Sequence, residues 1–320
     1  MGRLIDRYSV VAIAIAATLW ATDSYFRNAL VGHLSAPQVV FVEAGVVAVI
    51  LLPALVRGWA EVLRLSTRGW LATILIAVGP QALATVLFTA SFAYRNFAET
   101  YVLQQTQPLI AVLLAGVILG ERRRPAFWGA LALSMVAVYM VVFAPDPSAP
   151  LSVVKSGRVE AGALALGAAA LWASGTVLGR YVLGSISFPT MTSLRVTLAL
   201  PVLAGIVLAT SGPAGFTHYR VSDVPAFLGL AVLTGVLALL LYYRALSRTP
   251  ATLSSVAELA FPITATLIAS APAPIGFAQP IFPAQVVGTV LLLAVIVIVN
   301  ANRREVMVAV PQPIEAPAPA

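Results

Sequence analysis

The chain has 320 residues, of which 60% are hydrophobic and only 10% are charged. Soluble domains usually carry about 25% charged residues, and a mean hydropathy of +0.96 is far above what a water-facing surface allows. The composition therefore excludes a soluble globular protein and indicates a polytopic membrane protein.

The absence of cysteine excludes disulfides, thiol nucleophiles and thiolate metal sites. The formal net charge of +7 comes largely from arginines in short loops beside apolar runs, where basic residues act as topology determinants. Both histidines, His33 and His218, fall in predicted loops. We therefore expect no nucleic-acid partner, no metal and no cofactor.

Ten apolar segments approach the length of about 20 residues that a membrane-spanning helix needs. Their approximate ranges are 8–30, 37–56, 69–92, 97–119, 125–144, 159–182, 187–210, 224–246, 250–271 and 282–301. Their near-continuous apolarity excludes the short alternating strands of a membrane barrel. The predicted fold is all-α and integral to the membrane, with ten transmembrane helices.

The distribution of basic residues predicts the orientation. With a cytoplasmic N-terminus, 13 of the 19 Lys and Arg residues fall in cytoplasmic segments and five in extracytoplasmic ones. The positive-inside rule then places both termini in the cytoplasm. Arg3 and Arg7 before an apolar run resemble a signal peptide, but the run extends to Trp20 and no cleavage site follows, so we expect a retained first span. This predicts a multi-pass protein of the cytoplasmic (inner) membrane.

The two halves of the chain repeat each other. Leu19-Trp20-Ala21-Thr22 corresponds to Leu171-Trp172-Ala173-Ser174 at an offset of 152, and Pro108 corresponds to Pro262 at an offset of 154. The predicted organisation is a first five-helix repeat at 8–144, an extracytoplasmic linker at 145–158, a second repeat at 159–304 and a disordered cytoplasmic tail at 305–320.

An odd number of spans per repeat means that the second repeat enters the membrane from the opposite side. Inverted repeats are the architecture of many secondary transporters, whose substrate site lies near the midplane between the repeats.

These motifs resemble the drug/metabolite transporter superfamily, and more narrowly its EamA-type ten-helix branch. The resemblance covers roughly residues 8–304 and rests on Ala93-Tyr94-Arg95…Gln107-Pro108, on Tyr243-Arg244-Ala245-Leu246…Phe261-Pro262 and on Leu119-Gly120-Glu121. The second half departs from it at Ala269-Ser270-Ala271, where the Gly-Glu pair is missing. The resemblance implies a cavity lined by helices one, three, four, six, eight and nine, and export of amino acids or other small metabolites.

Five charged residues lie within the predicted spans: Asp23, Arg27, Glu43, Arg195 and Glu258. A charge at a helix centre costs about 2.5–3.5 kcal/mol, so these groups must pair or face water. Depths calculated at about 1.5 Å per residue predict an outer cluster of the first three residues and an inner pair of Arg195 with Glu258. The surplus carboxylate of the outer cluster makes protons a candidate coupling ion. Alternatively, the pairs only hold helices together.

Polar and aromatic residues with helical spacing predict the walls of a substrate cavity. The candidates are Trp20, Gln81, Thr85, Phe88, Tyr101, Gln104, Trp172, Ser255 and Glu258. Pro108 and Pro262 remove a backbone donor and predict helix kinks beside them. Tyr242 and Tyr243, near the end of the eighth span, are either interface anchors or gates.

The sequence favours a secondary transporter that exports small metabolites, most simply amino acids, by alternating access. The expected partners are a small-molecule substrate and the lipid bilayer, and we expect a monomer or a weak dimer. Alternatives with the same fold are a channel and a lipid or drug translocator. An intramembrane enzyme would need a catalytic constellation, and no predicted span contains His or Cys. We therefore predict no catalytic residue and no enzymatic activity.

Overall fold

The computed structural model describes residues 8–91, 104, 106–143, 147–148, 159–272, 278 and 280–301. Every regular element in this part of the chain is a helix. Eight helices are long and apolar enough to cross a membrane, and Gln107–Ile118 and Pro283–Val299 are shorter apolar helices. The predicted all-α membrane fold is therefore confirmed, whereas the count of ten spans and the cytoplasmic location of the termini remain predictions. The predicted tail at 305–320 and most of the linker at 145–158 lie outside the described residues.

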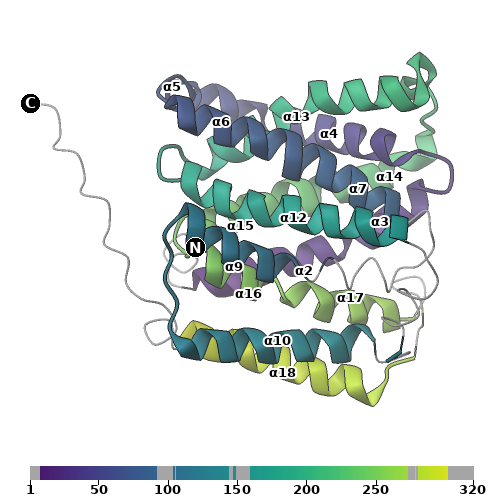
Figure 1. Cartoon of the computed structure of the whole chain (residues 1–320). Coiled ribbons are helices and arrows are strands. Elements are labelled where there is room, and N and C mark those ends of the chain that lie inside the picture. Colours follow the sequence, from purple (N-terminus) through teal and green to yellow (C-terminus); the bar gives the residue numbers. More distant parts are fainter. Residues whose placement is uncertain are drawn as a thin grey trace, which may run out of the picture.

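The chain forms its helices in two series (Figure 1). The first comprises α2 (Ser9–Ala21), α3 (Asp23–Leu30), α4 (Ala36–Arg57), α5 (Trp59–Leu63), α6 (Thr67–Ile76), η1 (Ala77–Leu83), α7 (Ala84–Ser91), α9 (Gln107–Ile118) and α10 (Pro125–Val142). The second comprises α12 (Val159–Val182), α13 (Phe188–Ser211), η3 (Pro213–Phe216), η4 (Val221–Asp223), α14 (Val224–Gly229), η5 (Leu230–Leu237), α15 (Ala238–Leu246), α16 (Ala251–Ala257), α17 (Ala260–Ser270) and α18 (Pro283–Ala301).

Local sequence determines where these helices begin. Before α4, the backbone N–H of Ser35 donates to Gln38 Oε1 at 2.8 Å, which forms half of a capping box, and Pro37 occupies the first turn. Along the helices, apolar side chains point outward as well as inward. Val117, for example, is 86% exposed. A helix that is apolar all round suits a membrane span.

Two hydrogen bonds at one end of the bundle show that the first helices of the repeats run in opposite directions. Ser9, at the start of α2, accepts a hydrogen bond from Thr249 at 2.8 Å, and Arg180, at the end of α12, donates to the Ser247 carbonyl at 2.8 Å. The start of α2 therefore lies at the same end of the bundle as the end of α12. This end is the predicted cytoplasmic end.

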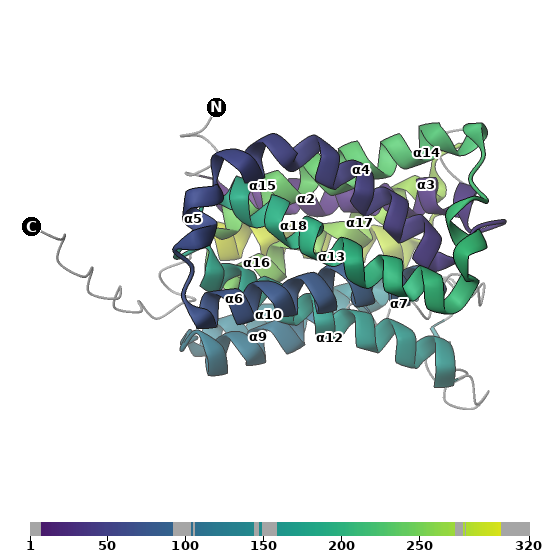
Figure 2. The ribbon, with the colours of Figure 1, turned by 90° about the horizontal axis from the view of Figure 1, so that it is seen from above.

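The first helix of each repeat packs inside the other repeat. Helix α2 lies mainly against α15, α16 and α17, whereas α12 lies mainly against α6, η1, α7 and α9. The α4–α13 pair forms the most extensive interface and covers one side of the bundle (Figure 2). The α10–α18 pair packs together at the opposite edge (Figure 1). The centre of the bundle therefore lies between two groups of helices, and each group contains helices from both repeats.

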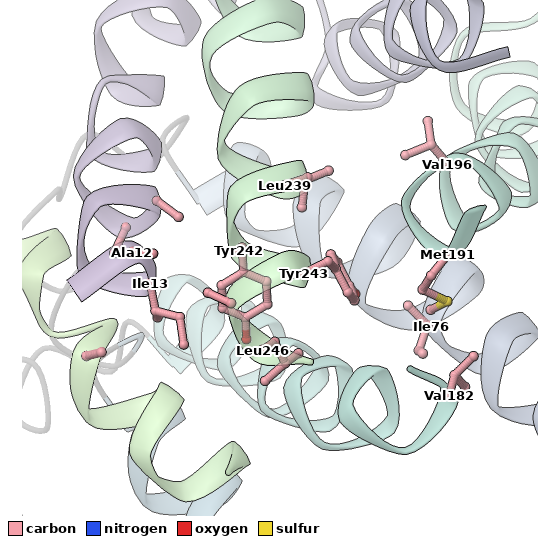
Figure 3. Close-up of a cluster of buried hydrophobic side chains, with 14 of the residues drawn as sticks. Ala12, Ile13, Ile76, Val182, Met191, Val196, Leu239, Tyr242, Tyr243 and Leu246 are labelled. Carbon is pink, nitrogen blue, oxygen red and sulfur yellow. The ribbon is translucent and has the colours of Figure 1, made fainter. Parts of the chain in front are cut away.

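The main hydrophobic core extends across both repeats. It brings Ile13 and Ile76 of the first repeat together with Met191, Leu239 and Tyr243 of the second (Figure 3). Small residues allow close approach where the repeats meet.

A Cβ atom at Gly175 of α12 would lie 2.7 Å from the ring of Pro80. Glycine is therefore needed at this crossing of α12 and η1.

Candidate functional site

A cavity of about 160 Å³ lies between the repeats. Its first-repeat lining includes Trp20, Asp23, Arg27, Glu43, Pro80, Gln81, Thr85, Phe88, Gln104, Gln107 and Pro108. Its second-repeat lining includes Trp172, Thr176, Arg195, Thr234, Tyr242, Tyr243, Glu258 and Phe261. The walls combine aromatic rings with all five charged residues that the sequence places within spans.

Most of the residues predicted to line a cavity do so. Trp20, Gln81, Thr85, Phe88, Gln104, Trp172 and Glu258 all belong to the lining. Ser255 does not belong to it. Its side chain is fully buried, and its hydroxyl donates to the Ala251 carbonyl one turn earlier at 2.9 Å. Tyr101 lies outside the described residues.

The two prolines lie at helix starts rather than at kinks within continuous helices. Pro108 occupies the first turn of α9, whose first residue is Gln107. In the second repeat the span breaks between α16 and α17, with Pro262 in the first turn of α17. The Glu258 carbonyl, one turn before Pro262, accepts the Phe261 N–H at 3.0 Å. The breaks place Gln107 and Glu258 beside the cavity.

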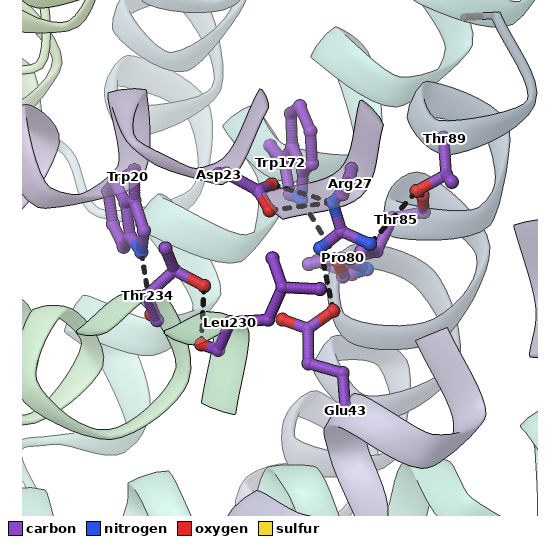
Figure 4. Close-up of polar contacts among 10 residues, drawn as sticks. All are labelled: Trp20, Asp23, Arg27, Glu43, Pro80, Thr85, Thr89, Trp172, Leu230 and Thr234. Carbon is purple, nitrogen blue, oxygen red and sulfur yellow. Dashed lines mark hydrogen bonds and ion pairs between the residues drawn. The ribbon is translucent and has the colours of Figure 1, made fainter. Parts of the chain in front are cut away.

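Arg27 is the centre of the outer charge cluster, in which three helices meet (Figure 4). Its Nε lies 2.7 Å from Asp23 Oδ1, its Nη2 donates to Glu43 Oε2 at 2.6 Å, and its Nη1 donates to Thr89 Oγ1 at 3.2 Å. The Arg27 residue is only 2% exposed. The predicted pairing of Arg27 with both carboxylates is therefore present. Each of the three guanidinium nitrogens contacts an oxygen atom of the protein.

The predicted inner ion pair between Arg195 and Glu258 is wrong. Arg195 Nη1 donates to the hydroxyl of Tyr243, and no ion pair joins it to a carboxylate within the described part of the chain. The predicted depths of Arg195 and Glu258 are similar, but depth does not specify lateral neighbours. Tyr243 and Tyr242 of α15 contact Arg195 and Glu258 instead. Tyr242 and Tyr243 of α15 have rings at 88° to each other, so adjacent residues contact different charged groups.

Glu258 is held by neutral donors. Its carboxylate accepts from Gln107 Nε2 at 2.6 Å, from Tyr242 Oη at 2.8 Å and from Thr176 Oγ1 at 3.4 Å. These donors come from α9, α15 and α12, so Glu258 joins both repeats. The sequence analysis did not predict Gln107 and Thr176 as cavity residues. The only signal was that Gln107 directly precedes Pro108 and that Thr176 lies one turn after Trp172.

The two repeat-related tryptophans make equivalent cross-repeat hydrogen bonds. Trp20 Nε1 donates to the Thr234 carbonyl at 3.2 Å, and Trp172 Nε1 donates to the Pro80 carbonyl at 3.0 Å (Figure 4). Both acceptors lie in π-helical segments, η5 and η1, of the third span of the opposite repeat. π-Helical turns depart from the α-helical hydrogen-bond register and occur frequently at functional sites. The sequence did not predict these segments, although Pro80 and Gly235 within spans are compatible with irregular helix.

Within the described residues, His, Asp and Glu side chains form no group of three or more that could hold a metal ion.

Inverted helical repeats around a polar and aromatic cavity define this protein as a multi-pass membrane transporter. The EamA-like transporter family matches residues 7–143 and 161–301, and the chain belongs to this family.

Two known proteins illustrate the similarity. The riboflavin transporter ImpX of Fusobacterium nucleatum subsp. nucleatum is 28% identical over 263 residues, which cover 80% of this chain and 86% of that protein. A solved structure described only as the crystal structure of a protein has a TM-score of 0.69 at 18% identity, covering 92% of this chain and 96% of that one. The second similarity concerns the fold alone.

The outer cluster predicts a large stability effect at Arg27. Arg27→Met leaves Asp23 and Glu43 buried without their cation, which should lower the free energy of unfolding by about 3–5 kcal/mol. Adding Asp23→Asn and Glu43→Gln should recover most of this loss, because the remaining groups are neutral. Denaturant unfolding of the purified protein in detergent measures both effects. A triple variant as unstable as Arg27→Met would contradict the electrostatic explanation.

Proposed function

We propose that this chain is a secondary transporter of the cytoplasmic membrane that exports small metabolites, with amino acids as the main substrate class. The observation that carries the proposal is the cavity between inverted repeats, which contains buried charges of both signs. A site of this kind near the midplane suits alternating access, and oppositely charged groups suit a zwitterionic substrate. The export direction rests on the family resemblance.

A flavin is a second candidate substrate, because a relative is named as a riboflavin transporter. Aromatic side chains would support a planar ring in this cavity. Trp20 packs against Tyr242 with ring centroids 4.9 Å apart, and Phe88 packs against Trp172 at 5.1 Å.

Alternating access in this bundle would move two mixed bodies rather than two intact repeats. One body consists of the third and fourth spans of the first repeat together with α12. The other consists of the third and fourth spans of the second repeat together with α2. The packing of α2 and α12 on the opposite repeats supports this division, and the tryptophan hydrogen bonds lie within each body. The α4–α13 pair would act as the scaffold between them.

A latch between the two bodies is present at the predicted cytoplasmic end. Gly120 has a φ of +65°, in the left-handed region that favours glycine, and the Glu121 N–H donates to the Ala115 carbonyl at 3.2 Å. The Glu121 carboxylate then accepts from the N–H groups of Ala251 and Thr252 at 2.8 and 3.0 Å, and from Thr252 Oγ1 at 2.6 Å. The second repeat has Ala269-Ser270-Ala271 at the corresponding place, so this carboxylate latch belongs to one end only.

The substrate proposal is tested by solute counterflow in proteoliposomes with amino acids, riboflavin, nucleosides and cationic drugs. We expect counterflow of amino acids. Counterflow of riboflavin alone would select the second candidate. Counterflow of none of these solutes by folded protein would contradict a metabolite transporter of either class.

Proton coupling is expected to act through Glu258 rather than Glu43. Protonation of Glu258 breaks no ion pair among the described residues, whereas protonation of Glu43 disrupts its contact with Arg27. The titratable and charged groups facing the Glu258 region are Tyr242 and, beyond it, Tyr243 and Arg195. Glu258→Gln should abolish the difference between the transport rates at about pH 6 and about pH 8, and Glu43→Gln should retain this difference. Measuring initial rates at both pH values decides this, and persistent pH dependence in Glu258→Gln would remove Glu258 from the coupling role.

The latch is tested by labelling a cavity residue, which the absence of native cysteine makes simple. In a Leu239→Cys background, Glu121→Ala should raise the rate of labelling from the cytoplasmic side by about tenfold, because charge-assisted hydrogen bonds contribute about 1.5–3 kcal/mol each. A membrane-impermeant maleimide applied to inverted vesicles measures the rate.

Glu61→Ala is the matched control for this experiment. The Glu61 carboxylate accepts the Ser187 N–H at 2.7 Å at the same end, but it joins the scaffold rather than the moving bodies. We expect its labelling rate to match that of the Leu239→Cys parent. Equal rates in Glu121→Ala and Glu61→Ala would refute the latch.

A further inference from the structure

Arg195 is a buried cation whose hydrogen-bonding capacity is mostly unused. The residue is 7% exposed and lines the cavity from α13. A guanidinium has five N–H donors. Arg195 uses Nη1 toward Tyr243 Oη, while its buried Nε has no hydrogen-bond partner in the described part of the chain. No described carboxylate forms an ion pair with it.

The contrast with Arg27 makes this observation informative. Both guanidiniums face the same cavity, but Arg27 is neutralised by two carboxylates and also donates to a hydroxyl. Glu258 has three donors. A buried charge without a counter-ion is strongly destabilising, and ionisable groups kept within a membrane usually have a functional role. Of the two arginines that line the cavity, Arg195 is therefore the one that needs an external counter-ion.

The surroundings of Arg195 hold the guanidinium in place without neutralising it. Its Cζ lies 5.2 Å from the centroid of the Tyr243 ring, within the range of a cation–π contact. The Tyr243 hydroxyl accepts from Nη1, and Gly179 makes room for the ring, since a Cβ there would lie 2.9 Å from it. The guanidinium is thus positioned in advance for an acceptor with two oxygens.

An unpartnered acceptor faces the same cavity. Gln104 Oε1 is buried and accepts no hydrogen bond from any described residue. Together with the Glu258 carboxylate, it gives the cavity acceptors that complement the free donors of Arg195. The formal charges of Arg195 and Glu258 cancel, so this part of the cavity favours a ligand whose own charges also cancel.

We propose that Arg195 binds the carboxylate of a zwitterionic substrate, whose ammonium group is received by Gln104 and Glu258. This assignment rests on the proposed transport function and makes an α-amino acid, rather than a cation or a neutral solute, the preferred substrate. A carboxylate matches the planar fork of a guanidinium and forms two parallel charge-assisted hydrogen bonds.

The test measures ligand binding to the full-length purified protein by calorimetry. L-Phenylalanine is the main probe because aromatic rings line the cavity. L-Phenylalaninamide lacks the carboxylate and 3-phenylpropionate lacks the ammonium group. The unmodified protein should bind L-phenylalanine at least about tenfold more tightly than either analogue. Arg195→Gln should weaken L-phenylalanine binding by about tenfold or more and should leave binding of the amide nearly unchanged.

Two further variants make the result specific. Arg195→Lys keeps the charge but lacks the planar fork, so it should bind L-phenylalanine with intermediate affinity. Arg248→Gln removes one exposed cation outside the cavity and should bind L-phenylalanine like the unmodified protein. The thermal unfolding temperature of each unliganded variant verifies that it is folded.

The outcomes separate this inference from the proposed function. If L-phenylalanine undergoes counterflow but Arg195→Gln binds it with unchanged affinity, the role of Arg195 is overturned while the transport function stands. Equal weakening of L-phenylalanine and L-phenylalaninamide would also overturn carboxylate recognition. Binding and counterflow of riboflavin without L-phenylalanine would overturn the zwitterionic substrate but not transport.

Discussion

A charged side chain inside a bilayer has no solvent to compensate it, so its partners must come from the protein or from a bound molecule. This constraint explains the two regions of the cavity. Arg27 holds Asp23, Glu43 and Thr89 together and thereby ties α3, α4 and α7 into one structure. Arg195 has no such set of partners. The outer region is therefore a structural joint, and we infer that the inner region completes its electrostatics only when a solute is bound.

The ion pairs of the outer charge cluster could be predicted from the sequence. Spacing of four residues places Asp23 and Arg27 on one helix face, and the depth of Glu43 brings it to the same level. Lateral position could not be predicted, because nothing in the spacing within one helix specifies its neighbours. Arg195 and Glu258 were consequently predicted to pair, although they contact Tyr243 and Tyr242 of α15 instead.

Other differences between sequence and structure have local causes. Repeated Trp20 and Trp172 predicted the duplication, but not the π-helical turns that accept their indole hydrogens. Such turns depend on packing against a neighbouring helix more than on residue propensity. Ser255 has helical spacing to Glu258, yet α16 ends at Ala257 and the Ser255 hydroxyl bonds within its own helix. The sequence motifs identify the family. The inference about the substrate instead depends on which charged groups in the cavity have a partner within the protein.

The exchange of first helices between the repeats also constrains how the protein is made. Helix α2 enters the membrane first, but its main neighbours, α15, α16 and α17, are among the last to be synthesised. Helix α12 instead meets finished partners from the first repeat as soon as it is inserted. Until these helices are synthesised, α2 lacks its main native neighbours, and the nascent bundle must retain an open flank. The first helix of this transporter therefore acquires its native packing only after the third and fourth spans of the second repeat have been inserted.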